Sequence, residues 1–314
     1  MATVPARGLN PAGAMGADFG GEELSAHRSA VRIGGVSLAI NGEAGDVALH
    51  PGLDNFKISA NACDIEILVQ WCEVMPAPPG RKIFHSGGVW TLYENDFYYV
   101  FDCETLPLGD EPYKRLFVNK NFSNGELLLN RKTVWPSKQT CPLEYPLDEL
   151  LVTNWLSLRG AVEVHGCGLL DHETGGHLFV GNSGAGKSTT TELWRSHRKA
   201  GVLSDDRVIL RAQGPDIWMH GTPWHGEVAL ASPECAKISR IFVLEHGAEN
   251  EIEPLPPARA VGELFARCFP PFYSRQGLES VLAFLQHIAL SVPCYLFRFV
   301  PDESAVEKVL NFQG

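Results

Sequence analysis

The chain has 314 residues, of which 45% are apolar, so it can bury a sizeable core and is not globally disordered. The 37 acidic and 26 basic side chains give a formal net charge of −11, which argues against broad binding to nucleic acids or anionic membranes. No apolar run reaches membrane-spanning length, and the eight cysteines are scattered without a CxxC pair. We therefore expect a cytoplasmic protein with reduced thiols.

The residue pattern predicts three parts along the chain. Residues 1–27 are rich in Gly and Ala, which is typical of a mobile tail. Residues 28–141 read as strands, for example at Val31–Ile40 and Val89–Asp102, and predict a β-rich accessory domain. Residues 142–314 mix strands with amphipathic helices and predict an α/β domain.

The third part begins with a helical pattern at Leu147–Leu158. Two short apolar runs follow, Ala161–Leu170 and His177–Val180, and they predict a hairpin whose second strand leads into a glycine-rich loop. The later elements are expected as helices at Lys187–Arg198, Ala258–Cys268, Gly277–Ser291 and from Glu303, and as strands at Gly201–Leu203, Arg207–Arg211, Ile238–Leu244 and Cys294–Val300.

The glycine-rich loop carries the most specific motif of the chain. Its residues are Gly181, Asn182, Ser183, Gly184, Ala185, Gly186, Lys187 and Ser188, followed by Thr189, and they fit the pattern GxxxxGK[ST]. Glycines let backbone N–H groups curl around an anion, and the following helix adds the positive end of its dipole. Lys187 can reach the β- and γ-phosphates, and the Ser188 hydroxyl can ligate Mg²⁺. The sequence therefore predicts a P-loop, the Walker A motif, which binds ATP with Mg²⁺.

The loop alone is also similar to that of ABC transporter ATPases. Those proteins need an LSGGQ-type signature and a later apolar run that ends in Asp-Glu. Neither feature follows Ser188, and the remaining chain is short for that fold. We therefore exclude this class.

Asp205 and Asp206 follow the loop after one predicted helix and one predicted strand. We expect them at the end of the strand next to the one that leads into the loop, beside the γ-phosphate. Adjacent side chains on a regular strand face opposite ways, so both can serve one site only where the strand ends or bends. Phosphoryl transfer needs a metal-holding carboxylate and a proton-accepting one, and the pair offers both. The alternative is a solvated turn with an Asp–Arg pair.

Three blocks together resemble the catalytic domain of HPr kinase/phosphorylase-like proteins, whose fold is related to that of phosphoenolpyruvate carboxykinase. The blocks are His165-Gly-Cys-Gly, the Gly181–Ser188 loop and Ser204-Asp-Asp-Arg, and the similarity covers about residues 160–245. It implies a catalytic centre made of His165, Lys187, Asp205 and Asp206. It also implies that Ser188 holds Mg²⁺ and that Asp206 is the better match for the proton acceptor. Asp205 is then the candidate metal ligand, although the sequence leaves open which aspartate has which role.

The resemblance has two departures. Thr189 stands where the bifunctional HPr kinases carry Glu, and His220–Glu227 replaces a Glu-x-Arg-Gly-Leu-Gly segment. The chain is therefore closer to divergent HPr kinase-like proteins, some of which phosphorylate peptides, than to enzymes that act on HPr.

Further candidates lie outside these blocks. Glu227 is a candidate Mg²⁺ ligand, and Trp224 or His225 is a candidate contact for nucleotide or substrate. A simple Pro-Gly turn anchored by Trp224 explains the same residues equally well. Arg267 and Arg275 are candidates for an arginine that stabilises charge, although arginines at such positions are more often surface residues.

The leading function is an ATP/Mg²⁺-dependent kinase that phosphorylates a hydroxyl, serine foremost, of a peptide or protein. One alternative is a small-molecule kinase on the same scaffold, and another is a non-catalytic nucleotide-gated regulatory module. The expected partners are a nucleotide and a peptide or protein acceptor, with no nucleic acid and no membrane. The sequence leaves open the identity of the acceptor, the preferred nucleotide and the formation of homo-oligomers.

Overall fold

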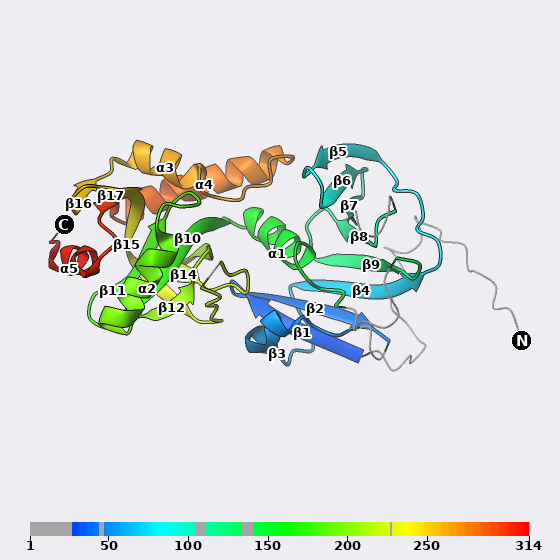
Figure 1. Cartoon of the computed structure of the whole chain (residues 1–314). Helices are drawn as coiled ribbons and strands as arrows, with labels where there is room; N and C mark the ends of the chain where they lie inside the picture. The colour runs from blue at the N-terminus through cyan, green and yellow to red at the C-terminus, as the bar shows by residue number, and fades with distance from the viewer. Residues whose placement is uncertain (1–26, 44–46, 105–110, 134–140, 227, 314) are drawn as a thin grey trace, which may run out of the picture.

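The computed structural model describes residues 27–43, 47–104, 111–133, 141–226 and 228–313. Within these ranges the strands form two large sheets, and the fold is mixed α/β. Figure 1 shows an elongated molecule with one sheet toward each end and the helix α1 (Leu147–Ser157) between them. The tail predicted over residues 1–27 lies outside the described residues except for its last position.

The first sheet has nine strands in the order β3-β1-β2-β4-β9-β8-β7-β6-β5. Their bounds are β1 His27–Ile33, β2 Val36–Gly42, β3 Lys57–Ile58, β4 Ile65–Cys72, β5 Arg81–His85, β6 Trp90–Glu94, β7 Tyr98–Cys103, β8 Lys114–Asn119 and β9 Asn124–Asn130, with a short 3₁₀ helix at Pro51–Phe56. Strand β4 runs parallel to β2 and β9, and the remaining pairs are antiparallel. The N-terminal part is therefore β-rich.

Two predicted strands of this part are wrong because each contains a turn. The run Val31–Ile40 is a hairpin, since Ile33 pairs with Val36 across Gly34 and Gly35. These glycines have φ angles of +59° and +76°, the left-handed conformation that a two-residue hairpin turn requires. The run Val89–Asp102 is likewise divided between β6 and β7, which pair antiparallel.

The second sheet has eight strands and carries the predicted site. Its elements are β10 Ala161–Asp171, β11 Gly175–Val180, α2 Lys187–Arg198, β12 Gly201–Ser204, β13 Arg207–Gln213, β14 Asp216–His220, β15 Cys235–His246, β16 Glu251–Pro254, α3 Pro257–Phe265, α4 Arg275–Ser291, β17 Cys294–Phe299 and α5 Glu303–Asn311. The hairpin of β10 and β11 is present as expected. Strands β14 and β16 were not predicted from the sequence.

Helices cover both faces of the eight-stranded sheet. On one face, α3 and α4 bury residues such as Leu264 and Leu285 against the sheet. On the other face, α2 and α5 bury Trp194 and Val306. Strand β15 runs parallel to β11 and to β17, so the carboxyl ends of these three strands meet at one edge. That edge carries the glycine-rich loop.

Helix α1 belongs to the core of the nine-stranded sheet. Leu147, Leu151 and Trp155 lie in the same hydrophobic cluster as the strand residues of that sheet, and Ile209 of β13 joins the cluster from the other sheet. The helix thus packs where the two sheets approach each other. The division of the chain at residue 142 stays a prediction.

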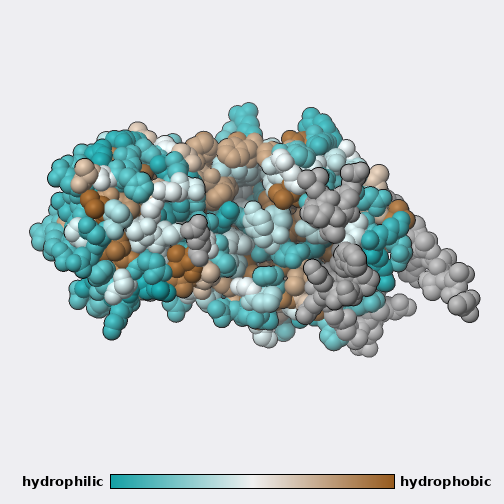
Figure 2. Space-filling model, in the orientation of Figure 1, coloured by the Kyte–Doolittle hydropathy of each residue, from teal (hydrophilic) through white to brown (hydrophobic). Residues whose placement is uncertain are grey.

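The surface is mostly hydrophilic on the face drawn in Figure 2, and hydrophobic residues gather over α4. All eight cysteines are free, which agrees with the expected absence of disulfide bonds. Among the helices of the described ranges, none combines the length and apolar character needed to cross a membrane.

Candidate functional site

The predicted phosphate-binding loop joins β11 to the first turn of α2. The helix begins at Lys187, with Gly186 as its N-cap at a φ of +98°, and no side chain caps its first N–H groups. Gly184 also has a positive φ, +79°, and open space lies where a Cβ would stand. A glycine-rich turn with uncapped N–H groups at a helix start is suited to an anion, because these donors otherwise lack partners.

The Lys187 side chain is folded over this loop. Its Nζ donates to the backbone oxygens of Gly181 and Asn182 at 3.1 and 3.2 Å. Burial lowers the pKa of Lys187, while the negative charge of Asp206 acts against this shift. The ammonium group is thus buried and, among the described residues, bonded only to two uncharged carbonyl oxygens. A phosphate oxygen can replace these carbonyls, because they do not neutralise the charge of the ammonium group.

Two residues that sequence reasoning missed support the loop from the neighbouring strands. His246, the last residue of β15, donates from Nε2 to the Gly184 oxygen at 2.8 Å. Its ring stacks on Phe299, which ends β17, with a centroid separation of 5.8 Å. A Cβ on Gly186 would lie 2.4 Å from the Phe299 ring. No local motif marks these positions, because they approach the loop only through the parallel pairing of the strands.

The two predicted aspartates lie in a bend between β12 and β13. The expectation that β12 neighbours the strand leading into the loop is wrong, because β12 pairs with β10. Strand β10 pairs with β11 along one edge and with β12 along the other. The end of β12 therefore approaches the loop from the edge of β10 that faces away from β11. The bend also satisfies the condition that both carboxylates can be used, since β12 ends at Ser204.

Asp205 is buried and holds the following loop. Its Oδ1 accepts a hydrogen bond from the Gly226 N–H at 3.0 Å, and its Oδ2 accepts one from the Val228 N–H at 2.9 Å. Both oxygens are therefore engaged by the backbone, and the carboxylate positions Gly226 and Val228. A carboxylate oxygen has further lone pairs, so this arrangement is compatible with a metal ligand as well.

Asp206 points the other way and is half-buried. Its Oδ1 accepts a hydrogen bond from His165 Nε2 at 2.8 Å, and its Oδ2 lies 3.5 Å from Arg207 Nε. The hydrogen bond from His165 lowers the pKa of Asp206, and the charges of Arg207 and Lys187 add to this effect. The structure thus brings His165, Lys187 and Asp206 together.

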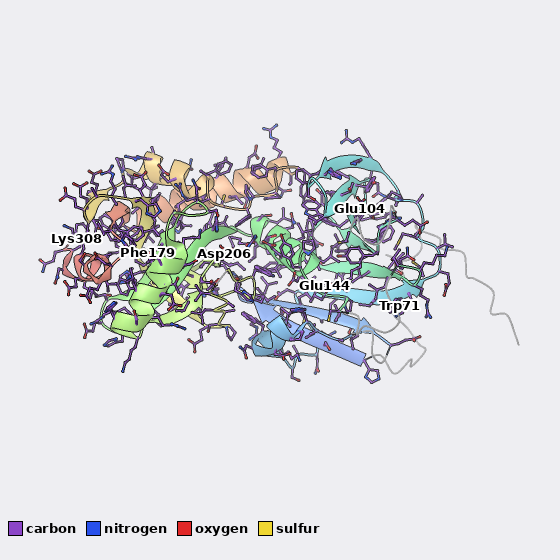
Figure 3. The ribbon with its side chains drawn as sticks, in the orientation of Figure 1. Trp71, Glu104, Glu144, Phe179, Asp206 and Lys308 are labelled. Carbon is purple, nitrogen blue, oxygen red and sulfur yellow. The ribbon has the colours of Figure 1, made fainter. Side chains whose placement is uncertain are left out.

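Figure 3 shows Asp206 between the core of the eight-stranded sheet, marked by Phe179, and Glu144.

The predicted metal ligands are only partly placed. Ser188 lies in the first turn of α2, directly after Lys187, as a P-loop serine would. Glu227 lies outside the described residues. In the part of the chain that the structure describes, no group of three or more His, Cys, Asp or Glu side chains could hold a metal ion. A hydroxyl and a carboxylate nevertheless fit Mg²⁺, which keeps several waters and uses phosphate oxygens as further ligands.

A cavity of about 500 Å³ opens beside Asp206. Arg207, Trp224 and His225 line it from one side, and His50 and Leu53 line it from the N-terminal part. Trp224 is buried and donates from Nε1 to Asp148 at 3.0 Å, so it anchors its turn. Residues from the N-terminal part and from the β12–β13 region thus lie around the carboxylate.

The two candidate arginines differ in their surroundings. The Arg267 side chain is largely buried, bonds to Glu263 and leaves its Nε without a hydrogen-bond partner among the described residues. It lies near enough to Lys187 to lower the pKa of that lysine. Arg275 is 91% exposed and pairs with Glu279. Arg267 is therefore the one that can act at the loop.

Comparisons with known proteins give little help with function. No protein-family model matches the chain, and no curated protein matches it. Among solved structures, the HPr(Ser) kinase/phosphatase from Coxiella burnetii is similar at 12% identity and a TM-score of 0.28, over 47% of this chain and 93% of that one. Similarity at this level assigns neither an activity nor a residue role, so both must be inferred from the site itself.

Proposed function

We propose that the chain is a kinase that uses ATP and Mg²⁺ to phosphorylate a hydroxyl group, with serine of a peptide or protein as the leading acceptor. The proposal rests on the placement of Lys187, whose Nζ bonds to the backbone oxygens of Gly181 and Asn182 in the loop, and of Asp206, whose carboxylate is held by His165 at 2.8 Å. Phosphoryl transfer needs both charges, one to offset phosphate oxygens and one to accept a proton. The motif resemblance to HPr kinase-like proteins at these residues supports the same assignment.

Each side chain has a role that follows from its surroundings. Bound Mg-ATP would supply the phosphoryl group and the metal that neutralises its charge. Lys187 and the first N–H groups of α2 would bind phosphate oxygens, and Ser188 would ligate the metal. Asp206 is ionised at neutral pH, because its pKa lies below the ordinary value. It would accept the proton that the acceptor hydroxyl releases, while His165 holds the carboxylate in position.

A second candidate is a small-molecule kinase. The cavity of about 500 Å³ beside Asp206 falls within the roughly 300–1,000 Å³ of ordinary small-molecule pockets. A peptide is favoured because His50 and Leu53 extend the lining of this cavity onto the N-terminal part, well beyond the catalytic residues. A non-catalytic module would bind the nucleotide and transfer nothing.

The first test is nucleotide binding by the full chain. Titration calorimetry with Mg-ATP should detect binding, and Lys187→Ala should weaken it about tenfold or more, since a charge-assisted phosphate contact is lost. Lys237→Ala is the matched control, because Lys237 is exposed and pairs with Asp216. A wild-type chain that binds no nucleoside triphosphate in the presence of Mg²⁺ would contradict the proposal.

The second test identifies the acceptor class. The full chain is incubated with radiolabelled Mg-ATP and either a serine-containing peptide library or a panel of small hydroxylated metabolites. Label on peptides supports the leading proposal, and label on metabolites alone supports the second candidate. Nucleotide binding without transfer to any hydroxyl, water included, would indicate the regulatory module.

A further inference from the structure

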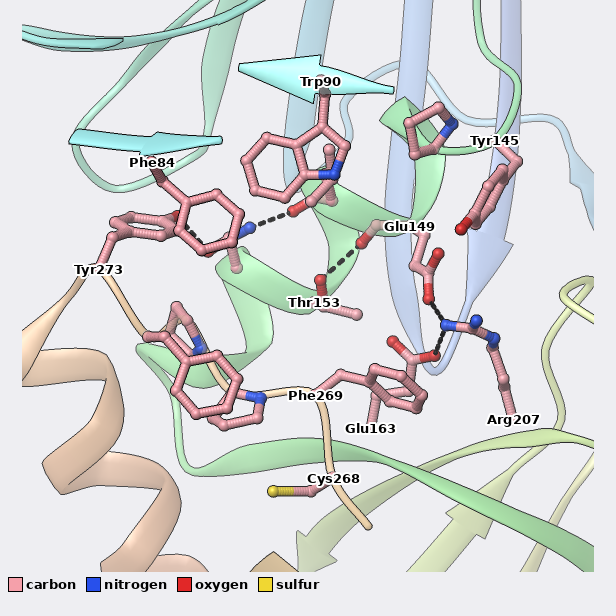
Figure 4. Close-up of a pocket in the computed structure, with 16 residues that line it drawn as sticks. Phe84, Trp90, Tyr145, Glu149, Thr153, Glu163, Arg207, Cys268, Phe269 and Tyr273 are labelled. Carbon is pink, nitrogen blue, oxygen red and sulfur yellow. Dashed lines mark hydrogen bonds and ion pairs between the residues drawn. The ribbon is translucent and has the colours of Figure 1, made fainter. Parts of the chain in front are cut away.

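A second cavity, of about 260 Å³, lies between the two sheets. Its walls come from segments that are distant in the sequence, as Figure 4 shows. Phe84 of β5 and Trp90 of β6 lie on one side, Thr153 of α1 lies at the back, and Phe269 and Tyr273 come from the segment before α4. The volume lies below the roughly 300–1,000 Å³ of pockets for whole ligands, so the cavity fits a single side chain.

The polar groups of the wall bond to one another. The Thr153 hydroxyl donates to the Glu149 oxygen at 2.7 Å, and Asn154 Nδ2 donates to the Leu150 oxygen at 2.7 Å. The Tyr273 hydroxyl donates to Asn154 Oδ1. A guest therefore has few polar partners to meet here, and a polar guest would lose hydrogen bonds to water without replacement.

Rings dominate the remaining wall. Phe84 and Trp90 stack with their centroids 4.9 Å apart, and Phe269 lies under the Arg207 guanidinium at 4.4 Å. At the rim, Phe272 is 65% exposed and Tyr145 is 57% exposed. Exposed aromatic residues around an aromatic cavity mark a binding site more than a packing gap, because burying them in the free protein would be favourable.

The charged end of the cavity is already balanced. Arg207 bonds to Glu149 and lies 3.4 Å from Glu163, whose side chain is fully buried. Burial raises the pKa of Glu163 well above its ordinary value and also raises that of Glu149, while the charge of Arg207 opposes both shifts. A cationic guest would find both carboxyl groups already facing the Arg207 guanidinium, and an anionic guest would find that guanidinium already paired.

The cavity is adjacent to the larger one beside Asp206. Arg207 and Tyr145 line both this cavity and the larger one beside Asp206. One chain can therefore place a hydroxyl near Asp206 and a neighbouring side chain in the smaller cavity. We propose that the cavity binds an uncharged aromatic side chain of the acceptor peptide or protein, close in sequence to the phosphorylated residue. This inference rests on the proposed kinase function.

Binding of the side chain can be tested without nucleotide or acceptor. N-acetyl-phenylalaninamide and N-acetyl-lysinamide are compared as probes of the full chain by saturation-transfer NMR. The phenylalanine probe should bind, and the lysine probe should bind at least about tenfold more weakly. Thr153→Phe, which fills the cavity, should weaken the phenylalanine probe about tenfold or more, whereas Thr153→Val, which keeps its volume, should not.

A second variant keeps the test valid if Thr153→Phe does not fold. Phe84→Ala removes a wall from the edge strand β5 and should also weaken the phenylalanine probe. Tighter binding of the lysine probe, or equal binding of the phenylalanine probe to wild type and both cavity variants, would overturn the proposal. Calorimetry with Mg-ATP on the same samples separates the two inferences, since failure of nucleotide binding alone contradicts only the kinase.

The link to catalysis needs peptides. A panel of short peptides carries one serine and one phenylalanine at varied spacing, with alanine replacing phenylalanine in the matched set. Phosphorylation should depend on the spacing, with the best phenylalanine peptide having a KM about tenfold below that of its alanine partner. Thr153→Phe should remove this difference. Equal KM values at every spacing would overturn the proposal.

Discussion

His165 and Asp206 are joined by a hydrogen bond of 2.8 Å from Nε2 to Oδ1, although 41 residues separate them in the sequence. A backbone hydrogen bond beside this pair holds the two segments together, because the N–H of Gly166, the residue after His165, donates to the backbone oxygen of Asp206 at 2.9 Å. The Asp206 carboxylate is therefore held in one orientation, with Oδ2 3.5 Å from Arg207 Nε, in the lining of the larger cavity. An oriented carboxylate of this kind is what a general base requires.

The first prediction concerns this carboxylate. Asp206→Asn keeps the shape of the side chain and removes its ability to accept a proton. We expect phosphoryl transfer, measured as basal hydrolysis of Mg-ATP or as transfer to a peptide, to fall by roughly 10²–10⁴-fold. Affinity for Mg-ATP should change far less. Asp216→Asn is the control, because Asp216 lies at the start of β14 and pairs with Lys237.

Asp205→Asn should behave differently from Asp206→Asn. Asp205 accepts from the backbone N–H groups of Gly226 and Val228, and an amide can replace only one of these acceptors. We expect a loss of about 1–3 kcal/mol in the free energy of unfolding, together with a higher Mg²⁺ requirement for transfer. Equally small effects of both substitutions on transfer would mean that the pair is only a turn.

The helix and strands that carry the site could be predicted from the sequence, but the strand pairings and side-chain contacts between them could not. Helix α2 begins and ends where its pattern indicates, because capping and periodicity are properties of adjacent residues. The roles of Asp205 and Asp206 separate only through contacts with Gly226 and His165, which depend on how β10, β12 and β13 pair. The Gly34-Gly35 turn was hidden for a simpler reason, since apolar residues on both sides read as one strand.

The second prediction concerns the two loop glycines with positive φ. Gly184→Ala introduces backbone strain alone, because no atom lies within 4 Å of the added Cβ. Gly186→Ala adds a contact of 2.4 Å with the Phe299 ring. We expect Gly186→Ala to weaken Mg-ATP binding more than Gly184→Ala in calorimetry. The double variant with Phe299→Leu should recover part of the loss, and no recovery would contradict the proposed clash.

The third prediction concerns pH and stability. His177 is fully buried, and burial lowers its pKa from 6.5 to about 4. Between these pH values the unfolded chain binds a proton that the folded chain does not, so stability falls as the pH falls from 6.5 toward 4. His220, with its pKa lowered to about 4, acts in the same direction. For His177 alone, we expect the free energy of unfolding to fall by about 2 kcal/mol when the pH is lowered from about 7.5 to about 5.

Urea unfolding at these two pH values measures this loss. His177→Phe should reduce the pH dependence by the His177 share, since the ring packs against Trp194 at a centroid distance of 5.2 Å and a phenyl group fits there. His172→Gln should leave the pH dependence unchanged, because the His172 side chain is 69% exposed. An unchanged slope in His177→Phe would show that this histidine titrates alike in the folded and unfolded chains.

The fourth prediction concerns the packing of α1. Leu151 is buried in the cluster that joins this helix to the nine-stranded sheet. Leu151→Ala should lower the free energy of unfolding by about 2–5 kcal/mol, because a cavity is left in the core. Leu290→Ala is the matched control, since Leu290 is 77% exposed and its loss should cost less than about 0.5 kcal/mol. Similar values for the two variants would contradict the packing described for α1.

The last prediction concerns a fragment that starts at Pro142. Such a fragment keeps α1 and removes the nine-stranded sheet on which Leu147, Leu151 and Trp155 pack. These side chains would then form an exposed apolar patch, so we expect the fragment to aggregate, as judged by size-exclusion chromatography and light scattering. A soluble, monomeric fragment that binds Mg-ATP normally would show instead that the sheet is not needed as a cover. Loss of peptide phosphorylation by that fragment would then assign acceptor recognition to the N-terminal part.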